Sequence, residues 1–198
     1  MLNFLSLLIL TTCLFYPATA DEKNRSISTK TAVVFNTLCA KCHEGECSGR
    51  LSFNDTHTAA DSHITRYSEE TNITEGEIEG FFTLLNYMKT DCALLMPNED
   101  KRAKEDLSYY ALDSNKGYFI PLGNLETGRY LLSFKPNERI SFRVEVVSKQ
   151  IEPYLDRSVC RHQKEYLFSF TVKRPSPVFL RIRSRIPLHL SSLELKKI

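Results

Sequence analysis

The feature that most constrains the fold is a change in hydrophobic periodicity close to residue 117. Beyond that point apolar and polar residues alternate, as they do in half-buried β-strands. Tyr166, Phe168 and Phe170, for example, fall on one face of their segment. The alternation predicts strands over residues 128–134, 140–147, 166–172 and 178–190. We therefore expect residues 117–198 to form a small antiparallel β-sandwich.

Before residue 117 the spacing of apolar residues is helical. They recur every three or four positions between Glu75 and Thr90, and Thr74 with Glu77 forms a capping box at the start. Shorter helices are predicted over residues 29–38 and 101–112. Three short helices make a thin core, and a domain of this size usually needs a further element around which to pack. The expected fold class is α + β, with two domains over residues 27–116 and 117–198.

The two halves carry opposite charge. Residues 21–116 hold 11 Lys and Arg against 17 Asp and Glu, a charge of −6, whereas residues 117–198 hold 15 against 7, a charge of +8. The total of +2 is too small to indicate nucleic-acid binding. The basic row Arg181, Arg183 and Arg185 predicts docking on an acidic partner, a membrane surface or the chain's own acidic half. A solvated edge strand is the alternative.

Residues 1–20 have the features of an export signal. They contain no charged side chain, and their apolar run is ended by Pro17 and followed by the small-x-small pattern Ala18-Thr19-Ala20. The run is too short to span a membrane. We predict a signal peptide cleaved before Asp21, a periplasmic location and no transmembrane span after cleavage.

The motif that carries chemistry is Cys39-Ala40-Lys41-Cys42-His43. The C-x-x-C-H spacing is the attachment signature of c-type haem. Two thiols three positions apart add to the two vinyl groups on one edge of the porphyrin, and the adjoining imidazole then binds the iron. The motif predicts one haem c bound covalently by Cys39 and Cys42, with His43 as an iron ligand.

Three other uses of these cysteines stay open. A thioredoxin-like redox pair needs a strand–helix–strand frame, which the flanking sequence lacks. A zinc site formed with His43 and Cys47 needs a second ligand pair at the usual spacing. A plain disulfide framework is the third alternative, since export permits disulfides. The five cysteines beyond residue 20 are an odd number, so at least one thiol has another role.

Residues 27–116 resemble class I cytochromes c. Besides the C-x-x-C-H motif, the chain has the aromatic Phe35 four residues before it, the dipeptide Met96-Pro97, and a segment 107–110 that resembles the last helix of that family. It departs from the family at Thr31, where glycine usually allows the helices to cross closely. The resemblance implies a small all-α cytochrome c fold, single-electron transfer, and redox proteins as electron donor and acceptor.

The resemblance also implies the second iron ligand. These cytochromes carry a distal methionine in a Met-Pro dipeptide, so Met96 is the expected ligand, whereas Met88 has the helical spacing of a core residue. His57 and His63 are alternatives that would give bis-histidine ligation.

A further pair of cysteines lies close in sequence to the expected iron ligands His43 and Met96. Cys47 lies four residues after His43, and Cys92 lies four residues before Met96. A Cys47–Cys92 disulfide would tie the two segments together, and loop closure makes such a bridge worth roughly 3–4 kcal/mol. Cys160 would then remain an unpaired thiol to which we assign no function.

The alternating C-terminal half is similar in pattern to jelly-roll modules of the carbohydrate-binding type. Such modules hold sugars on aromatic platforms, and in the absence of Trp the candidates are Tyr118, Tyr130 and Tyr154. No spacing of Ser, His and acidic residues indicates a hydrolytic triad, so we expect no enzymatic activity. Two functions follow: an exported monohaem c-type cytochrome that carries single electrons, or a haem-bearing sensor or recognition subunit whose sandwich binds a ligand or glycan.

Overall fold

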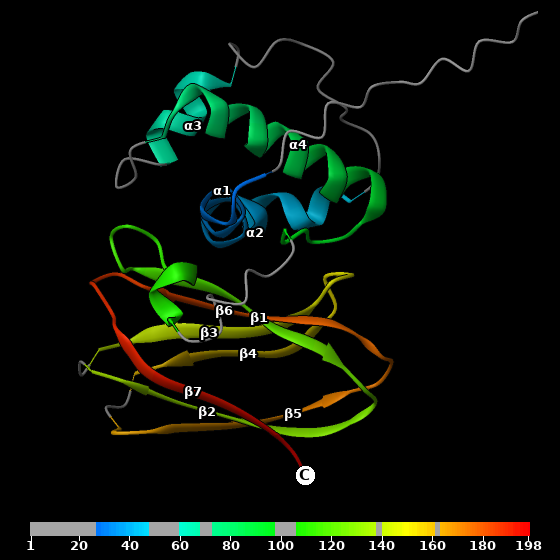
Figure 1. Cartoon of the computed structure of the whole chain (residues 1–198), viewed down its shortest axis with the longest axis vertical. Coiled ribbons are helices and arrows are strands. Elements are labelled where there is room, and N and C mark those ends of the chain that lie inside the picture. Colours follow the sequence, from blue (N-terminus) through cyan, green and yellow to red (C-terminus); the bar gives the residue numbers. More distant parts are fainter. Residues whose placement is uncertain (1–26, 48–59, 68–72, 98–105, 138–139, 161–162) are drawn as a thin grey trace, which may run out of the picture.

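The computed structural model describes residues 27–47, 60–67, 73–97, 106–137, 140–160 and 163–198. A helical region covers one sheet of a two-sheet β-sandwich, and the second sheet lies on the far side (Figure 1). One hydrophobic core cluster includes residues of both the helices and the sandwich. Residues 1–20 and His57 lie outside the described residues. Within the described residues, no helix has the length and apolar character needed to cross a membrane.

The helical region consists of short segments and one long helix. Its elements are α1 (Thr29–Val34), the π-helical turn η1 (Phe35–Cys39), α2 (Ala40–His43), η2 (Glu44–Glu46), α3 (Asp61–Tyr67), α4 (Glu75–Asp91) and the 3₁₀ turn η5 (Leu107–Tyr110). The capping box predicted for α4 is confirmed. The Thr74 hydroxyl accepts a hydrogen bond from the Glu77 amide, and the Glu77 carboxylate accepts one from the Thr74 amide.

Helices α1 and α4 meet at a glycine. A Cβ added to Gly80 of α4 would lie 2.8 Å from Cγ2 of Thr31 in α1, so only glycine leaves room for this threonine without a shift. The rings of Phe35 and Phe81 stack beside this contact, with their centroids 6.4 Å apart. The resemblance to class I cytochromes c leads us to expect a glycine at position 31, where it would leave room for the two helices to cross. Here Gly80 of α4 leaves that room instead.

The sandwich is antiparallel and, in the described residues, has seven strands. They are β1 (Gly117–Leu125), β2 (Gly128–Pro136), β3 (Phe142–Ser148), β4 (Pro153–Val159), β5 (Tyr166–Val172), β6 (Ser176–Ser184) and β7 (Leu190–Lys197). One sheet has the strand order β1-β6-β3-β4, and the other has the order β5-β2-β7. The predicted antiparallel β-sandwich is confirmed.

Several predicted elements differ from those observed. The strand predicted over residues 178–190 is two strands in different sheets, β6 and β7, with Pro187 in the connection between them. The helix predicted over residues 101–112 is, in its described part, the single turn η5. The alternation fails to predict β1 because Pro121 and Gly123 flank a bulge in this strand. The described helical elements do not make up a complete cytochrome c fold.

Strand β6 is buried on both faces, which corrects the prediction of a solvated basic face. Leu180 and Ile182 are fully buried, and Arg181 between them is only 1% exposed because the helical region covers this side of the sheet. Ile186, which the alternation of this segment puts on the same face as Leu180 and Ile182, lies beyond the end of β6 and is exposed. The alternation correctly predicted a strand here, but both faces of this strand pack against other parts of the protein.

Candidate functional site

A cavity of ≈ 260 Å³ lies between the segment that carries the C-x-x-C-H motif and helices α3 and α4. It is lined by Phe35, Leu38, Cys39, Cys42, His43, His63, Ile64, Phe81, Phe82 and Leu85. Apart from two thiols and two imidazoles, every lining side chain is a hydrocarbon. The fold therefore brings Cys39, Cys42 and His43, three of the four predicted site residues, to one apolar cavity.

The two motif cysteines are free thiols that differ in exposure. Cys39 ends η1 and is partly buried, whereas Cys42 lies in α2 and is exposed. Burial, with a smaller contribution from the Cys42 sulfur, raises the pKa of the Cys39 thiol to about 11. A thioredoxin-like redox cysteine has a lowered pKa instead, so the environment of Cys39 disfavours that alternative.

Two histidines lie close together in this cavity. His43 ends α2, and His63 belongs to α3. The centroids of their rings are 6.4 Å apart, and the ring planes are inclined by 73°. This proximity depends on the packing of α3 against the motif segment, and no local pattern in the sequence indicates it.

Met96 does not line this cavity. It lines a separate hollow of ≈ 170 Å³, together with Pro97, Pro121, Gly123, Asn124, Pro177, Val178 and Phe179. Helix α4 ends at Cys92, which has a left-handed φ of 48°. Beyond it the Leu94 amide donates a hydrogen bond to the Lys149 carbonyl, which holds the following residues beside the sandwich. Met88 is 1% exposed, as expected of a core residue.

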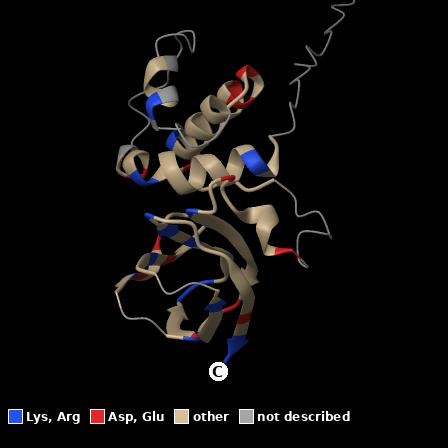
Figure 2. Cartoon of the chain, turned by 90° about the vertical axis from the view of Figure 1, so that its left-hand side faces the viewer, with Lys and Arg blue, Asp and Glu red and all other residues tan. Residues whose placement is uncertain are grey.

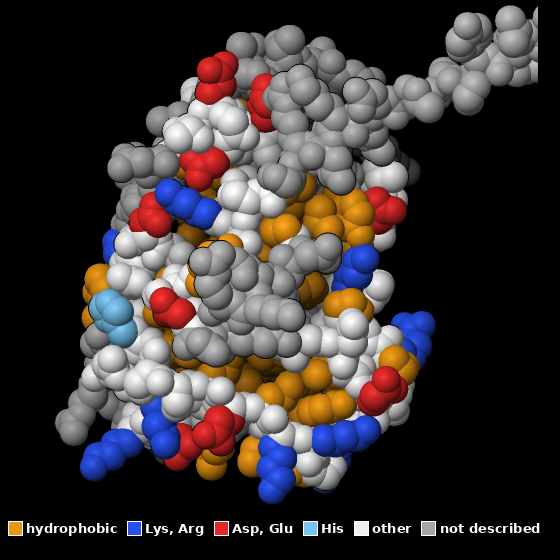
Figure 3. Space-filling model, in the orientation of Figure 1, with side chains coloured by type: hydrophobic (Ala, Val, Ile, Leu, Met, Phe, Trp, Pro, Cys, Tyr) orange, Lys and Arg blue, Asp and Glu red, His pale blue; other side chains and the backbone are white. Residues whose placement is uncertain are grey.

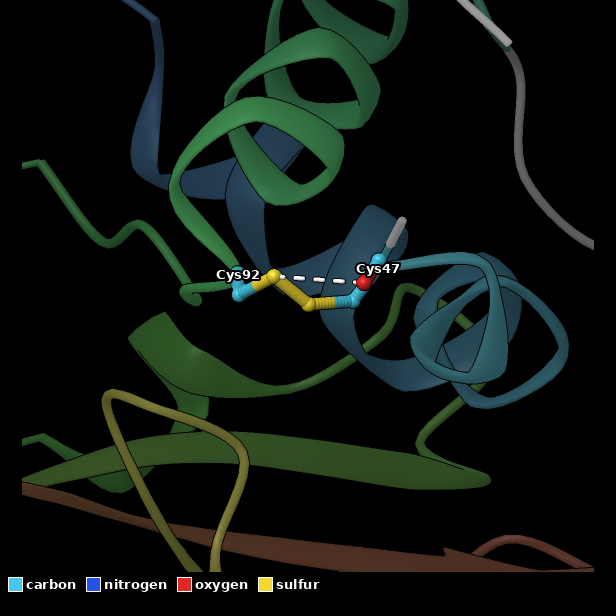
Figure 4. The surroundings of a disulfide bond; sticks show 2 residues. All are labelled: Cys47 and Cys92. Atoms are coloured by element: carbon cyan, nitrogen blue, oxygen red, sulfur yellow. Dashed lines mark hydrogen bonds between the residues drawn. A yellow bond between two sulfur atoms is a disulfide. The ribbon is translucent and has the colours of Figure 1, made fainter. Parts of the chain in front are cut away.

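A disulfide joins the end of the motif segment to the end of α4. Cys47 follows η2 and Cys92 follows α4, and their Cα atoms are 5.1 Å apart (Figure 4). The Cys47–Cys92 pairing considered from the sequence is confirmed. Cys160 is an exposed free thiol.

A network of buried ion pairs fastens the motif segment to the sandwich. The Glu145 carboxylate of β3 lies 2.5 Å from Nζ of Lys41 and 3.5 Å from Nη1 of Arg181. Arg181 also pairs with Glu44 at 2.5 Å. Lys41 lies between the motif cysteines and Glu44 follows His43, so the middle of the motif and its C-terminal end are tied to the sheet. Figure 2 shows acidic and basic parts of the ribbon close together on the sheet below the helices.

Glu145 is the centre of this network. Nη2 of Arg183 lies 3.3 Å from its carboxylate, and Nη2 of Arg143 lies 3.7 Å away. Burial raises the pKa of the Glu145 carboxyl, but the hydrogen bond from Lys41 and the surrounding positive charges lower it, so that the pKa lies below its ordinary value. Arg181 and Arg183 are thus paired within the chain, whereas Arg185 is exposed.

A second hollow, of ≈ 460 Å³, opens at the edge of the sandwich between β4 and the start of β5. It is lined by Arg157, Ser158, Val159, Cys160, Gln163, Tyr166, Leu167 and Phe168. Exposed guanidinium, hydroxyl and amide groups thus lie next to the aromatic rings of Tyr166 and Phe168. Figure 3 shows apolar side chains gathered in the lower half of one face, over the sandwich.

The tyrosines considered as sugar platforms are mainly structural. Tyr118 and Tyr130 are buried, and their hydroxyls donate hydrogen bonds to the carbonyls of Leu188 and Glu126. Tyr154 is partly buried and stacks on a core phenylalanine of the other sheet. Tyr118 and Tyr130 therefore present no exposed ring to a ligand.

Comparison with known proteins finds no matching family model and no matching curated protein. Among solved structures, a CBM4 carbohydrate-binding module has a TM-score of 0.34 and 15% identity, covering 41% of this chain and 73% of its own. The C-terminal domain of EclA, a sugar-binding protein, has a TM-score of 0.29 and 14% identity, covering 44% of this chain and 73% of its own. CpGH89CBM32-4 of Clostridium perfringens was solved with GlcNAc-α-1,4-galactose. It has a TM-score of 0.24 and 19% identity, and the match covers 40% of this chain and 60% of that structure's chain. At these values the matches assign neither a family nor a ligand.

The prediction of a metal-binding, electron-transporting cytochrome is corrected. Within the described residues, no group of three or more His, Cys, Asp or Glu side chains is arranged to hold a metal ion. A metal site built from side chains alone needs at least three ligands. The electron-carrier function is therefore not retained.

Proposed function

We propose that this protein is an exported, periplasmic recognition subunit whose helical region carries one covalently attached haem c and whose β-sandwich binds a ligand. The observation that supports the haem is the single apolar cavity that holds both thiols of the C-x-x-C-H motif and the His43 imidazole. A plain disulfide framework does not account for this cavity, because Cys39 and Cys42 are free thiols beside an apolar wall.

The residues around the cavity fit a haem group. Its wall of aliphatic and aromatic side chains, including Phe81 and Phe82, suits a flat apolar macrocycle. The porphyrin supplies four nitrogen ligands of its own, so the protein need not provide a cluster of three or more metal-binding side chains. When bound, a haem would supply an iron atom that accepts nitrogen ligands from the protein. Cys39 and Cys42 would hold its edge, and His43 would provide a nitrogen ligand to the iron.

The haem part of the proposal predicts a pigment that resists extraction. When the full chain is exported from cells with c-type haem maturation, the haem is expected to stay with the protein in acid–acetone. The double variant Cys39→Ser/Cys42→Ser is expected to lose this covalent haem, because both vinyl-reactive thiols are gone. Absorption spectra and intact mass measure the outcome.

The matched control for this experiment is Cys160→Ser, which removes an exposed thiol outside the cavity. This variant should retain the full haem mass. A wild-type protein that is colourless, or whose haem is fully extracted, would show that the haem proposal is wrong.

The recognition part of the proposal rests on the hollow between β4 and β5. Arg157, Ser158 and Gln163 offer hydrogen-bonding groups at its exposed rim, and the exposed Leu167 with the partly buried ring of Phe168 provides an apolar surface. Polar groups around an aromatic surface suit ligands that are rich in hydroxyl groups and have apolar ring faces. Oligosaccharides are therefore the first probes to test.

A single rim substitution tests this site. Arg157→Ala is expected to weaken the binding of an oligosaccharide recognised by the wild type roughly tenfold, because a hydrogen bond to a charged group is worth about 1.5 kcal/mol. Titration calorimetry measures the affinity after a glycan array has identified the probe. Arg185→Ala, which removes an exposed arginine outside the hollow, is the control. An array without binding, or equal affinities for the two variants, would refute the site.

A further inference from the structure

Two imidazoles from different helices line the cavity that the proposed haem would occupy. His43 comes from the motif and His63 from α3, and their ring centroids are 6.4 Å apart. Both rings contribute to the wall of the same cavity. Every other lining side chain, apart from the two thiols, is a hydrocarbon. His63 is thus a second imidazole in the wall of a cavity that is otherwise lined by hydrocarbon side chains and two thiols.

The separation of the two rings matches that of two ligands on opposite sides of one metal atom. An imidazole nitrogen binds a metal at about 2.0–2.1 Å and lies about 1.1 Å from the centre of its ring, so two axial imidazoles have centroids about 6.3 Å apart. The observed 6.4 Å agrees with this value. The same separation also lies within the range of about 4.5–7 Å for edge-to-face ring pairs, so the position of both rings in the wall of one cavity is the second observation that the inference needs.

The methionine expected at this position is held elsewhere. Met96 lines a hollow beside the sandwich, with Pro121 and Pro177 among its neighbours. The hydrogen bond from the Leu94 amide to the Lys149 carbonyl fixes the chain just before it. In this arrangement Met96 lies outside the motif cavity, whereas His63 lies in its wall.

We infer that His63 is the second axial ligand, opposite His43, so that the site is bis-histidine and not His/Met. This inference rests on the proposed covalent haem. It predicts that the ferric protein is six-coordinate and low-spin without a methionine charge-transfer band. It also predicts that carbon monoxide binds the reduced protein poorly, because His63 occupies the position that carbon monoxide would take.

The test compares haem-loaded full-length wild type, His63→Ala, Met96→Leu and His57→Ala by absorption and electron paramagnetic resonance. His63→Ala is expected to lose the low-spin ferric signal and to bind carbon monoxide fully when reduced, and added imidazole should restore the low-spin spectrum. Met96→Leu keeps the side-chain volume, and His57→Ala removes the other candidate histidine, so both should match wild type. Because His63 is exposed, its removal should leave the far-ultraviolet circular dichroism unchanged.

The outcomes separate this inference from the proposed function. Covalent haem in wild type with a low-spin His63→Ala variant would overturn the inference and leave the haem proposal standing. So would a methionine band that disappears in Met96→Leu, or a spin change confined to His57→Ala. A wild-type protein without covalent haem would refute the proposed function, and the axial assignment with it.

Discussion

Replacing Glu145 with glutamine is expected to lower the free energy of unfolding by about 3–5 kcal/mol, the usual cost of breaking a buried ion pair from one side. The Glu145 side chain is 7% exposed and faces Lys41 and Arg181. Without its charge, Arg181, which is 1% exposed, has one acidic partner, Glu44, in place of two, and the other cations around position 145 lose their shared carboxylate. Nε of Arg181 already has no hydrogen-bond partner within the described residues. Urea denaturation followed by circular dichroism measures the loss.

Glu165→Gln is the matched control for this substitution. The Glu165 carboxylate lies 3.8 Å from Nζ of Lys135, but both side chains are largely exposed. An exposed pair of this kind contributes less than about 1 kcal/mol, so the control should be close to wild type. Equal, small losses in the two variants would mean that the Glu145 network does not hold the helical region to the sandwich.

The same network makes stability depend on pH. Because the pKa of Glu145 is lower in the folded protein than in the unfolded chain, its contribution is complete above the ordinary pKa of a glutamate, about 4.3. The contribution is lost as the pH falls through the lowered pKa. Wild type should therefore lose stability more steeply than Glu145→Gln in this acidic range. Parallel curves of unfolding free energy against pH would contradict this assignment.

Removing the Cys47–Cys92 disulfide is expected to destabilise the protein by about 4 kcal/mol, the loop-closure value for cysteines 45 positions apart. The bridge restricts the unfolded chain, and in the folded protein it joins the end of the motif segment to the end of α4. Cys47→Ser/Cys92→Ser should show this loss in urea denaturation. Wild type treated with a reducing agent should approach the stability of the double variant.

Cys160→Ser provides the control for the disulfide experiment, because Cys160 is exposed and unpaired. Its unfolding free energy should change by no more than about 0.5 kcal/mol. If the double variant were as stable as this control, or if reduction had no effect on wild type, the disulfide would contribute nothing to stability.

The sandwich was predictable where each strand has one buried and one exposed face. Tyr166 and Phe170 of β5 are buried, and Leu167 and Ser169 between them are exposed, as alternation requires. The prediction failed for β6, because the packing of the helical region buries its second face as well. From the sequence, Arg181 has the pattern of a solvated residue. Its burial is explained by the helical region that covers it and by its pairing with Glu145 and with Glu44, which is 137 positions away.

The candidate site likewise has residues that the sequence predicted and residues that only the packing placed there. Cys39, Cys42 and His43 lie within five consecutive residues, so their proximity follows from local helix geometry alone. Met96 was chosen for its chemistry and the proline that follows it, and neither property specifies where the chain carries it. His63 had no distinguishing pattern at all.

The sequence by itself determined the antiparallel sandwich, the capping box of α4 and the C-x-x-C-H group, because each depends on residues a few positions apart. Only the tertiary structure decided that His63 lies in the motif cavity, that Met96 lies beside the sandwich, and that Arg181 is buried against Glu44. These contacts join residues of separate elements, and their positions depend on how the elements pack against one another, which local periodicity does not encode.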